Sequence, residues 1–163
     1  MIERYKAAAE RIRQTCADLD EIAGRARRAV AAMRRRVEEM DLLADSAALS
    51  LHDFYTGLER LFHHVAATID AKVPTGAPWH RELLEQMVGE MPGLRPAVLS
   101  QASVQGIDEY LRFRHVVRNV YSFVFDPARI ETLVDRLGSL LPRLREELEA
   151  FAGFLDKVSQ DDE

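Results

Sequence analysis

The residues best suited to chemistry lie in one stretch, 110–125, which holds three arginines, one histidine and no acidic side chain. On a helix, Arg114 and Arg118 lie one above the other because they are four residues apart. Like charges at this spacing destabilise a helix by about 0.2–0.5 kcal/mol, so we expect an anion to offset them. The anion is either a carboxylate, for which Glu59 and Asp53 are candidates, or a ligand phosphate bound by the guanidinium fork.

Polar side chains surround the two arginines on the same helix. Tyr110 and Tyr121 fall on the arc of the arginines, and His115 and Asn119 flank it. A nearby guanidinium lowers the pKa of a phenol or an imidazole. The strip therefore predicts an anion site. The alternative from the same residues is a salt-bridge cluster that holds a helical bundle together, with Tyr121 as a core residue.

The apolar residues of this stretch predict which side of the helix is buried. Phe113, Val116, Val117, Val120 and Val124 fall on one arc, at the spacing of an amphipathic helix. We therefore expect this arc to face the core and the arginine strip to lie beside it.

Three segments of the chain resemble a known family. They are residues 51–59 (LHDFYTGLE), 79–84 (WHRELL) and, above all, 112–121 (RFRHVVRNVY), within a region of about 48–158. Together they resemble the HepT-like branch of the HEPN superfamily, which contains toxins paired with minimal nucleotidyltransferase antitoxins. The resemblance implies an all-α HEPN-like fold.

The family motif can be placed on this sequence residue by residue. HEPN ribonucleases carry an arginine, then a polar residue, then a histidine four to six residues after the arginine, and HepT proteins add a tyrosine two residues later. With Tyr121 in the tyrosine place, Arg114 is the motif arginine and His115 is the polar residue. Asn119 then stands where the family has its histidine, so the chain departs from the pattern there.

The resemblance implies metal-independent cleavage of RNA at the interface of a homodimer. In that reaction an imidazole moves protons and an arginine stabilises the charged transition state. The implied catalytic residues are Arg114, His115, Arg118, Asn119 and Tyr121, the implied phosphate-binding residues are Arg112, Arg114 and Arg118, and Glu59, Asp53 and Tyr110 are supporting residues.

The same likeness implies how the activity is regulated. In HepT-like toxins the antitoxin attaches AMP to the motif tyrosine, so Tyr121 is the expected modification site, where added bulk and charge block the site. Two other functions remain open. Asn119 in the histidine place favours a non-catalytic helical protein that binds a nucleotide or a nucleotidyltransferase. The long apolar seam described next favours an assembly protein whose arginines are structural.

A long helix is predicted at the start of the chain. Twelve apolar residues from Ile2 to Met40 are spaced alternately three and four residues apart, which is a heptad seam over about 40 residues. We assign residues 1–44 to this helix. Because so long a helix outreaches a small bundle, we expect part of it to pack on a second subunit or another protein; the alternative is a hairpin arm within one monomer.

The rest of the chain predicts four more helices. One starts near Asp45 and runs to about Ile69, one spans 79–91, and one spans about 97–124. The last begins after Asp126 as N-cap with Pro127 in its first turn. We expect an antiparallel bundle of about five helices in a single domain, 1–163, with a core of 45–158 and a frayed acidic tail of 159–163.

Composition limits the class of protein. The 163 residues carry 22 basic and 27 acidic side chains, which argues against a strongly cationic coat for nonspecific nucleic-acid binding but leaves room for a small cationic pocket. The single cysteine, Cys16, excludes an internal disulfide and a CxxC zinc site. No apolar run is long enough for a membrane span, and the charged start lacks the apolar stretch of a signal peptide. We expect a cytoplasmic protein without a metal or another cofactor.

Overall fold

The computed structural model describes residues 1–119 and 125–161. In this part of the chain every regular element is helical, in the order α1 (Ile2–Arg35), η1 (Val37–Glu39), α2 (Met40–Thr68), α3 (Trp79–Val88), α4 (Gln101–Asn119) and α5 (Pro127–Asp161). The predicted all-α bundle of five helices is thus confirmed. None of the described helices combines the length and apolar character needed to cross a bilayer.

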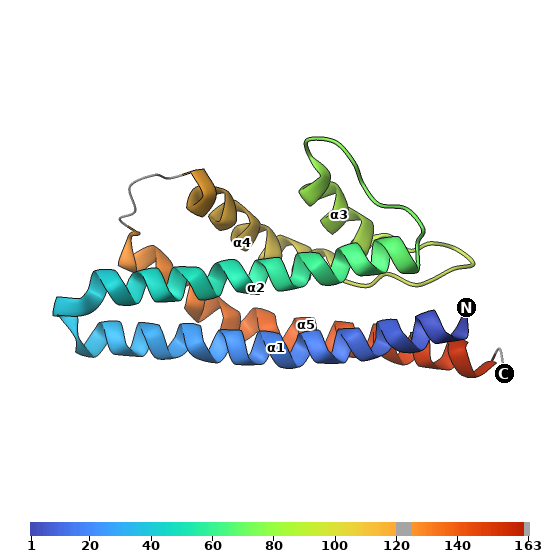
Figure 1. The fold of residues 1–163 in the computed structure, drawn as a ribbon, viewed down its shortest axis with the longest axis horizontal. Helices are drawn as coiled ribbons and strands as arrows, with labels where there is room; N and C mark the ends of the chain where they lie inside the picture. Colours follow the sequence, from blue (N-terminus) through green and yellow to red (C-terminus); the bar gives the residue numbers. More distant parts are fainter. Residues whose placement is uncertain (120–124, 162–163) are drawn as a thin grey trace.

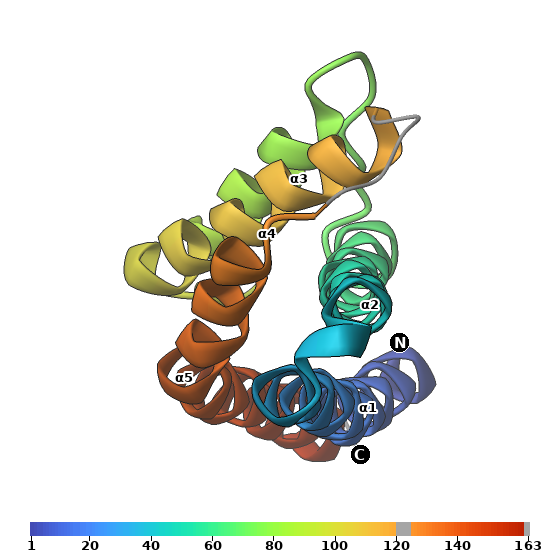
Figure 2. The same ribbon diagram turned by 90° about the vertical axis from the view of Figure 1, so that its left-hand side faces the viewer.

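Two long helices form an antiparallel hairpin, and a third lies along it. Figure 1 shows α1 and α2 side by side and joined at one end, with α5 following α1 so that both chain termini lie at the other end. The shorter α3 and α4 pack on the α2 side of this frame, as the end-on view in Figure 2 shows. Helix α4, which carries the arginine strip, therefore contacts both α2 and α3.

The first helix is shorter than the sequence predicts. It ends at Arg35, and Arg36 leaves the helical region with φ −123° and ψ 71°. The heptad spacing continues through this turn without glycine or proline to mark it, yet Val37 is 68% exposed. Residues 36–39 are therefore the reversal, and Asp45 and Ser46, the expected helix start, lie inside α2.

The seam of α1 is covered by helices of the same chain. Leu19, Val30 and six further residues of the seam are buried, and α1 contacts both α2 and α5. Alanines along the seam let these helices approach closely. The described structure is therefore the hairpin alternative, because α2 and α5 are long enough to cover the seam; contact of this helix with a second subunit stays a prediction.

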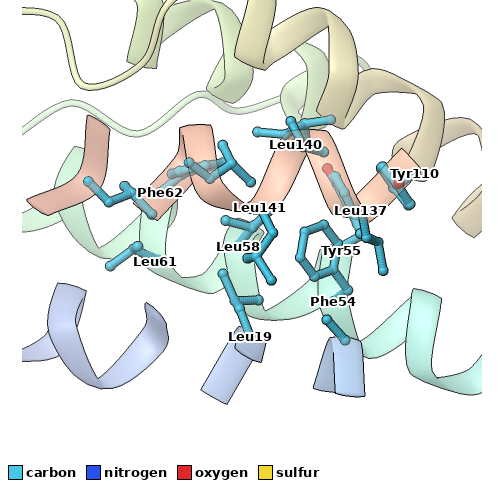
Figure 3. Packing of buried hydrophobic residues seen from close by; sticks show 14 of the residues in the cluster. Leu19, Phe54, Tyr55, Leu58, Leu61, Phe62, Tyr110, Leu137, Leu140 and Leu141 are labelled. Atoms are coloured by element: carbon cyan, nitrogen blue, oxygen red, sulfur yellow. The ribbon is translucent and has the colours of Figure 1, made fainter. Parts of the chain in front are cut away.

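One hydrophobic cluster joins all five helices. Figure 3 shows its centre, where Leu19 of α1 and Phe54, Leu58 and Leu61 of α2 pack among the leucines of α5. The rings of Phe54 and Tyr110 lie 5.3 Å apart, which ties α4 to α2. This core holds the arginine strip in a fixed position relative to α2.

The last helix begins as predicted and ends later. The Oδ1 of Asp126 accepts a hydrogen bond from the backbone N–H of Ala128 at 3.1 Å, and Pro127 occupies the first helical position. The expected frayed tail is wrong for 159–161, which remain helical, because Ser159 is buried and donates a hydrogen bond to the carbonyl of Asp156 at 2.7 Å.

Candidate functional site

Arg114 lies on the buried face of α4. It follows Ile107 by two turns and Tyr110 by one, and these residues face the core. Only 9% of Arg114 is exposed. It forms no ion pair with any described residue, and its Nε is buried without a hydrogen-bond partner among them. A buried guanidinium without a carboxylate is unusual, because removing a charge from water costs several kcal/mol.

The face of an aromatic ring is the nearest compensation. The Cζ of Arg114 lies 6.0 Å from the centroid of the Tyr55 ring, at the outer limit of a cation–π contact. The hydroxyl of Tyr55 donates a hydrogen bond to Oε2 of Glu59 at 2.6 Å. The same Oε2 lies 2.6 Å from Nδ1 of His80. Glu59 therefore does not pair with the arginines, and that expectation was wrong.

The other two arginines differ in how they are neutralised. Arg112 donates two hydrogen bonds to Oδ2 of Asp108, at 2.9 and 2.8 Å, and Arg81 approaches the other oxygen of Asp108 at 3.0 Å. Arg118 is exposed in the last turn of α4 and makes no ion pair with the described residues. Arg114 and Arg118 thus remain available for an anion, whereas Arg112 already has a carboxylate.

His115 and Asn119 lie on the exposed side of this end of α4. The ring of His115 faces that of His80 edge-on, with centroids 5.9 Å apart and planes at 86°. Asn119 is exposed and is the last residue of the helix. Tyr121, together with Val120 and Val124 of the expected apolar arc, lies outside the described residues.

Two supporting residues lie away from the arginines. Tyr110 is a core residue whose hydroxyl donates to the carbonyl of Leu133 at 2.8 Å, so its expected place beside the guanidiniums was wrong. Asp53 lines a groove of about 870 Å³ between α1 and α2.

The expected core arc of α4 is also displaced. Phe113 is buried and Val117 packs against the core, but Val116 is 46% exposed. The buried face is centred closer to Arg114 than the apolar residues alone indicate. Ser103 and Asp108, one small and one charged, are also buried. They extend the buried face of α4 away from the apolar arc and beyond Arg114.

Two residues of the cluster were missed as site residues by the sequence reasoning. Tyr55 lies one turn before Glu59 on α2, a spacing that is visible in the sequence. His80 comes from α3, and its ring lies against that of Trp79 with centroids 3.6 Å apart and planes tilted by 30°. No sequence signal joins His80 to Glu59, because a loop and 21 residues separate them.

Burial and the arginines set the electrostatics of the cluster. Desolvation lowers the pKa of His115, and the positive charge of Arg114 lowers it further. Desolvation, followed by the charge of Arg114, also lowers the pKa of His52 on α2. The pKa of Tyr55 is raised by burial and by its hydrogen bond to Glu59. The cluster thus keeps its phenol neutral and favours a neutral imidazole at His115.

The arrangement combines cations with groups that transfer protons. Arg114 and Arg118 can hold a phosphate, and two imidazoles, those of His80 and His115, lie beside them on α3 and α4. Within residues 1–119 and 125–161 no group of three or more His, Cys, Asp or Glu side chains is placed to hold a metal ion.

Comparisons with known proteins agree with the resemblance seen in the sequence. A family model described as HepT-like protein matches residues 46–155. The matched region contains α3 and α4 and all but the first residues of α2. It therefore includes Arg114 and Arg118 together with Tyr55, Glu59 and His80. Comparison with curated proteins and with solved structures gave no match. The chain therefore belongs to the HepT-like family of HEPN-type proteins.

Proposed function

We propose that the protein is a metal-independent endoribonuclease toxin. The observation that carries this proposal is Arg114, a guanidinium that is 9% exposed and has no carboxylate partner among the described residues. A phosphodiester bound there supplies the missing charge, and Arg118 one turn later contacts the same phosphate. A bound guanidinium also stabilises the extra negative charge of the phosphorane-like transition state.

The remaining residues of the strip have supporting roles in this proposal. His115 moves protons, and Asn119 orients the RNA at the end of α4. Arg112 contributes weakly to phosphate binding, because Asp108 already neutralises it. Tyr121 adjoins the strip in sequence and tunes the site.

The direct test is cleavage of a labelled RNA in the presence of EDTA. We expect the wild type to cut, and Arg114→Met to lose activity by about 100-fold or more, which is the effect of removing one transition-state donor. Arg28→Met is the matched control, because Arg28 is exposed on α1 and lies outside the region matched by the family, residues 46–155. Absence of cleavage by the wild type, or equal activity in both variants, refutes the nuclease.

A homodimer built on the exposed end of α4 is part of the proposal. Val116 is an apolar side chain that is 46% exposed between His115 and Val117, and a second copy of the same surface covers it in a twofold contact. We expect a particle of twice 18.5 kDa in sedimentation. Val116→Arg should give monomers and lose cleavage; a monomeric wild type that cuts RNA contradicts the dimer.

The proposed antitoxin is a nucleotidyltransferase that attaches AMP to Tyr121. The family assignment and the tyrosine seven residues after Arg114 support this role. Incubation with such an enzyme and ATP should add one adenylyl group to the wild type and none to Tyr121→Phe, and the modified protein should no longer cut RNA. Modification at another residue refutes this assignment.

A non-catalytic role is the second candidate, and Asn119 in the histidine place favours it. In that case the arginines bind a nucleotide or a partner without cleaving RNA. Calorimetry with ATP then gives a binding signal that Arg114→Met abolishes, while the wild type leaves RNA intact. The same cleavage assay therefore separates the two candidates.

A further inference from the structure

The proposed cleavage needs a proton-transferring imidazole, and the motif position that usually supplies it holds no histidine. Asn119 stands where HEPN ribonucleases carry a histidine, and an amide does not exchange protons at neutral pH. The chain has five histidines. His63 is exposed on α2, whereas His52 and His64 line the groove between α1 and α2. The remaining two, His80 and His115, face each other beside Arg114.

The ring of His80 is held in one orientation. Its Nδ1 lies 2.6 Å from Oε2 of Glu59, and that carboxylate is anchored in turn by the hydroxyl of Tyr55. A carboxylate only accepts hydrogen bonds, so Nδ1 carries the hydrogen and Nε2 of the neutral ring keeps its lone pair. Trp79 covers the ring at a centroid distance of 3.6 Å.

The hydrogen bond of the His80 ring to the described part of the chain goes through Nδ1, so the outer nitrogen, Nε2, is left for a ligand. His115 approaches at 5.9 Å between centroids, and Arg114 and Glu59 lie close enough to the His115 ring for their charges to act on it. A proton acceptor, a second imidazole and an uncompensated guanidinium thus converge from α3 and α4.

We propose that His80 is a catalytic residue that accepts the proton of the RNA 2′-hydroxyl, and that Glu59 is the positioning residue that aims it. This inference rests on the proposed nuclease function. Nε2 of His80 removes the 2′-hydroxyl proton while O2′ forms a bond to phosphorus. The P–O5′ bond breaks, and O5′ takes a proton from the imidazolium form of His115, which leaves that ring neutral. The products are a 2′,3′-cyclic phosphate and a 5′-hydroxyl, with Arg114 and Arg118 on the nonbridging oxygens.

Glu59 and His80 form the carboxylate–imidazole pair that serves as a general base in other enzymes. The carboxylate sets the tautomer before the reaction and stabilises the imidazolium that forms during it. His80 lies 39 residues before Asn119 in the sequence, yet α3 brings it to the same end of α4. In this protein the imidazole would therefore come from a second helix in place of the motif position.

The test compares His80→Ala, Glu59→Gln and the control His63→Ala in cleavage of a short RNA with EDTA. We expect His80→Ala to lose activity by about 100- to 10,000-fold, the contribution of a general base, and to recover part of it when free imidazole is added. Glu59→Gln should lower kcat with little change in KM, because RNA binding does not use it. His63→Ala should match the wild type.

The outcomes separate this inference from the nuclease itself. If the wild type does not cut RNA, both fail. If the wild type cuts and His80→Ala cuts equally well, the nuclease stands and His80 is not catalytic. Should His80→Ala unfold, as its melting curve would show, His80→Gln takes its place.

A further measurement does not depend on folding of a variant. A 2′-deoxy-substituted RNA oligonucleotide added to ¹⁵N-labelled wild type should shift the Nε2 resonance of His80. An unchanged resonance while Arg114 binds the oligonucleotide overturns the proposal.

Discussion

Replacing Arg114 with methionine separates a guanidinium kept for a ligand from one kept for the fold. Arg114 is 9% exposed, and its Nε has no partner among the described residues. A buried, uncompensated charge costs several kcal/mol. The contact with Tyr55 at 6.0 Å returns only about 0.5–2 kcal/mol. Methionine fills the same volume without a charge and packs well against an aromatic ring.

We therefore expect Arg114→Met to raise the free energy of unfolding by about 1–2 kcal/mol, within the range measured when buried ion groups become apolar. For a chain of this size that corresponds to a rise of about 2–8 °C in Tm. Thermal and urea unfolding followed by circular dichroism measure both quantities. The same variant should lose the RNA cleavage proposed above.

Arg95 provides the matched control. Its side chain is fully buried and pairs with Asp70 through Nε at 2.5 Å and Nη2 at 2.8 Å, and it donates further bonds to the carbonyls of Gly89, Pro96 and Gln86. Arg95→Met leaves the Asp70 carboxylate buried without its partner, so we expect a loss of about 3–5 kcal/mol. If Arg114→Met loses a similar amount, Arg114 is a structural arginine and the reasoning is refuted.

Four further predictions concern single residues. Gly138→Ala should raise stability by about 1 kcal/mol in chemical unfolding, because this glycine is exposed inside α5 and an added Cβ meets no atom within 4 Å; a loss contradicts the packing of α5. Tyr55→Phe should lower stability by about 1 kcal/mol, since the buried bond to Glu59 is lost; an unchanged unfolding midpoint contradicts that bond. Arg114→Met should raise the pKa of His115 in an NMR titration, because the charge of Arg114 helps to lower it. Since that pKa lies below the ordinary value of 6.5 in the folded protein, His115 should also make stability fall as the pH drops below 6.5, and a flat profile in that window counts against the lowered pKa.

Local patterns were sufficient for the helical elements. Apolar residues at helical spacing placed five helices, and Asp126 followed by Pro127 placed the start of α5 to the residue. The reversal at Arg36 was not predictable in this way. The heptad spacing runs through it, and neither glycine nor proline marks it, so only the length of the partner helices locates the turn.

The site was predictable in part. The helical spacing and charge of Arg114 and Arg118 indicated an anion site, and the resemblance to HepT-like proteins is confirmed by the family match over 46–155. The roles of the site residues remain predictions. The partner of Glu59 was misjudged: spacing along one helix identifies neighbours within that helix, whereas His80 reaches Glu59 from another helix.

Composition and periodicity thus establish an all-helical chain with a cationic strip on its fourth helix, because helix formation and amphipathic spacing depend on residues within a few turns of each other. The burial of Arg114, the neutralisation of Arg112 and the meeting of Glu59 with His80 depend on how α2, α3 and α4 pack together. Such contacts join residues distant in the chain, and their free energies come from desolvation and geometry that no local pattern encodes.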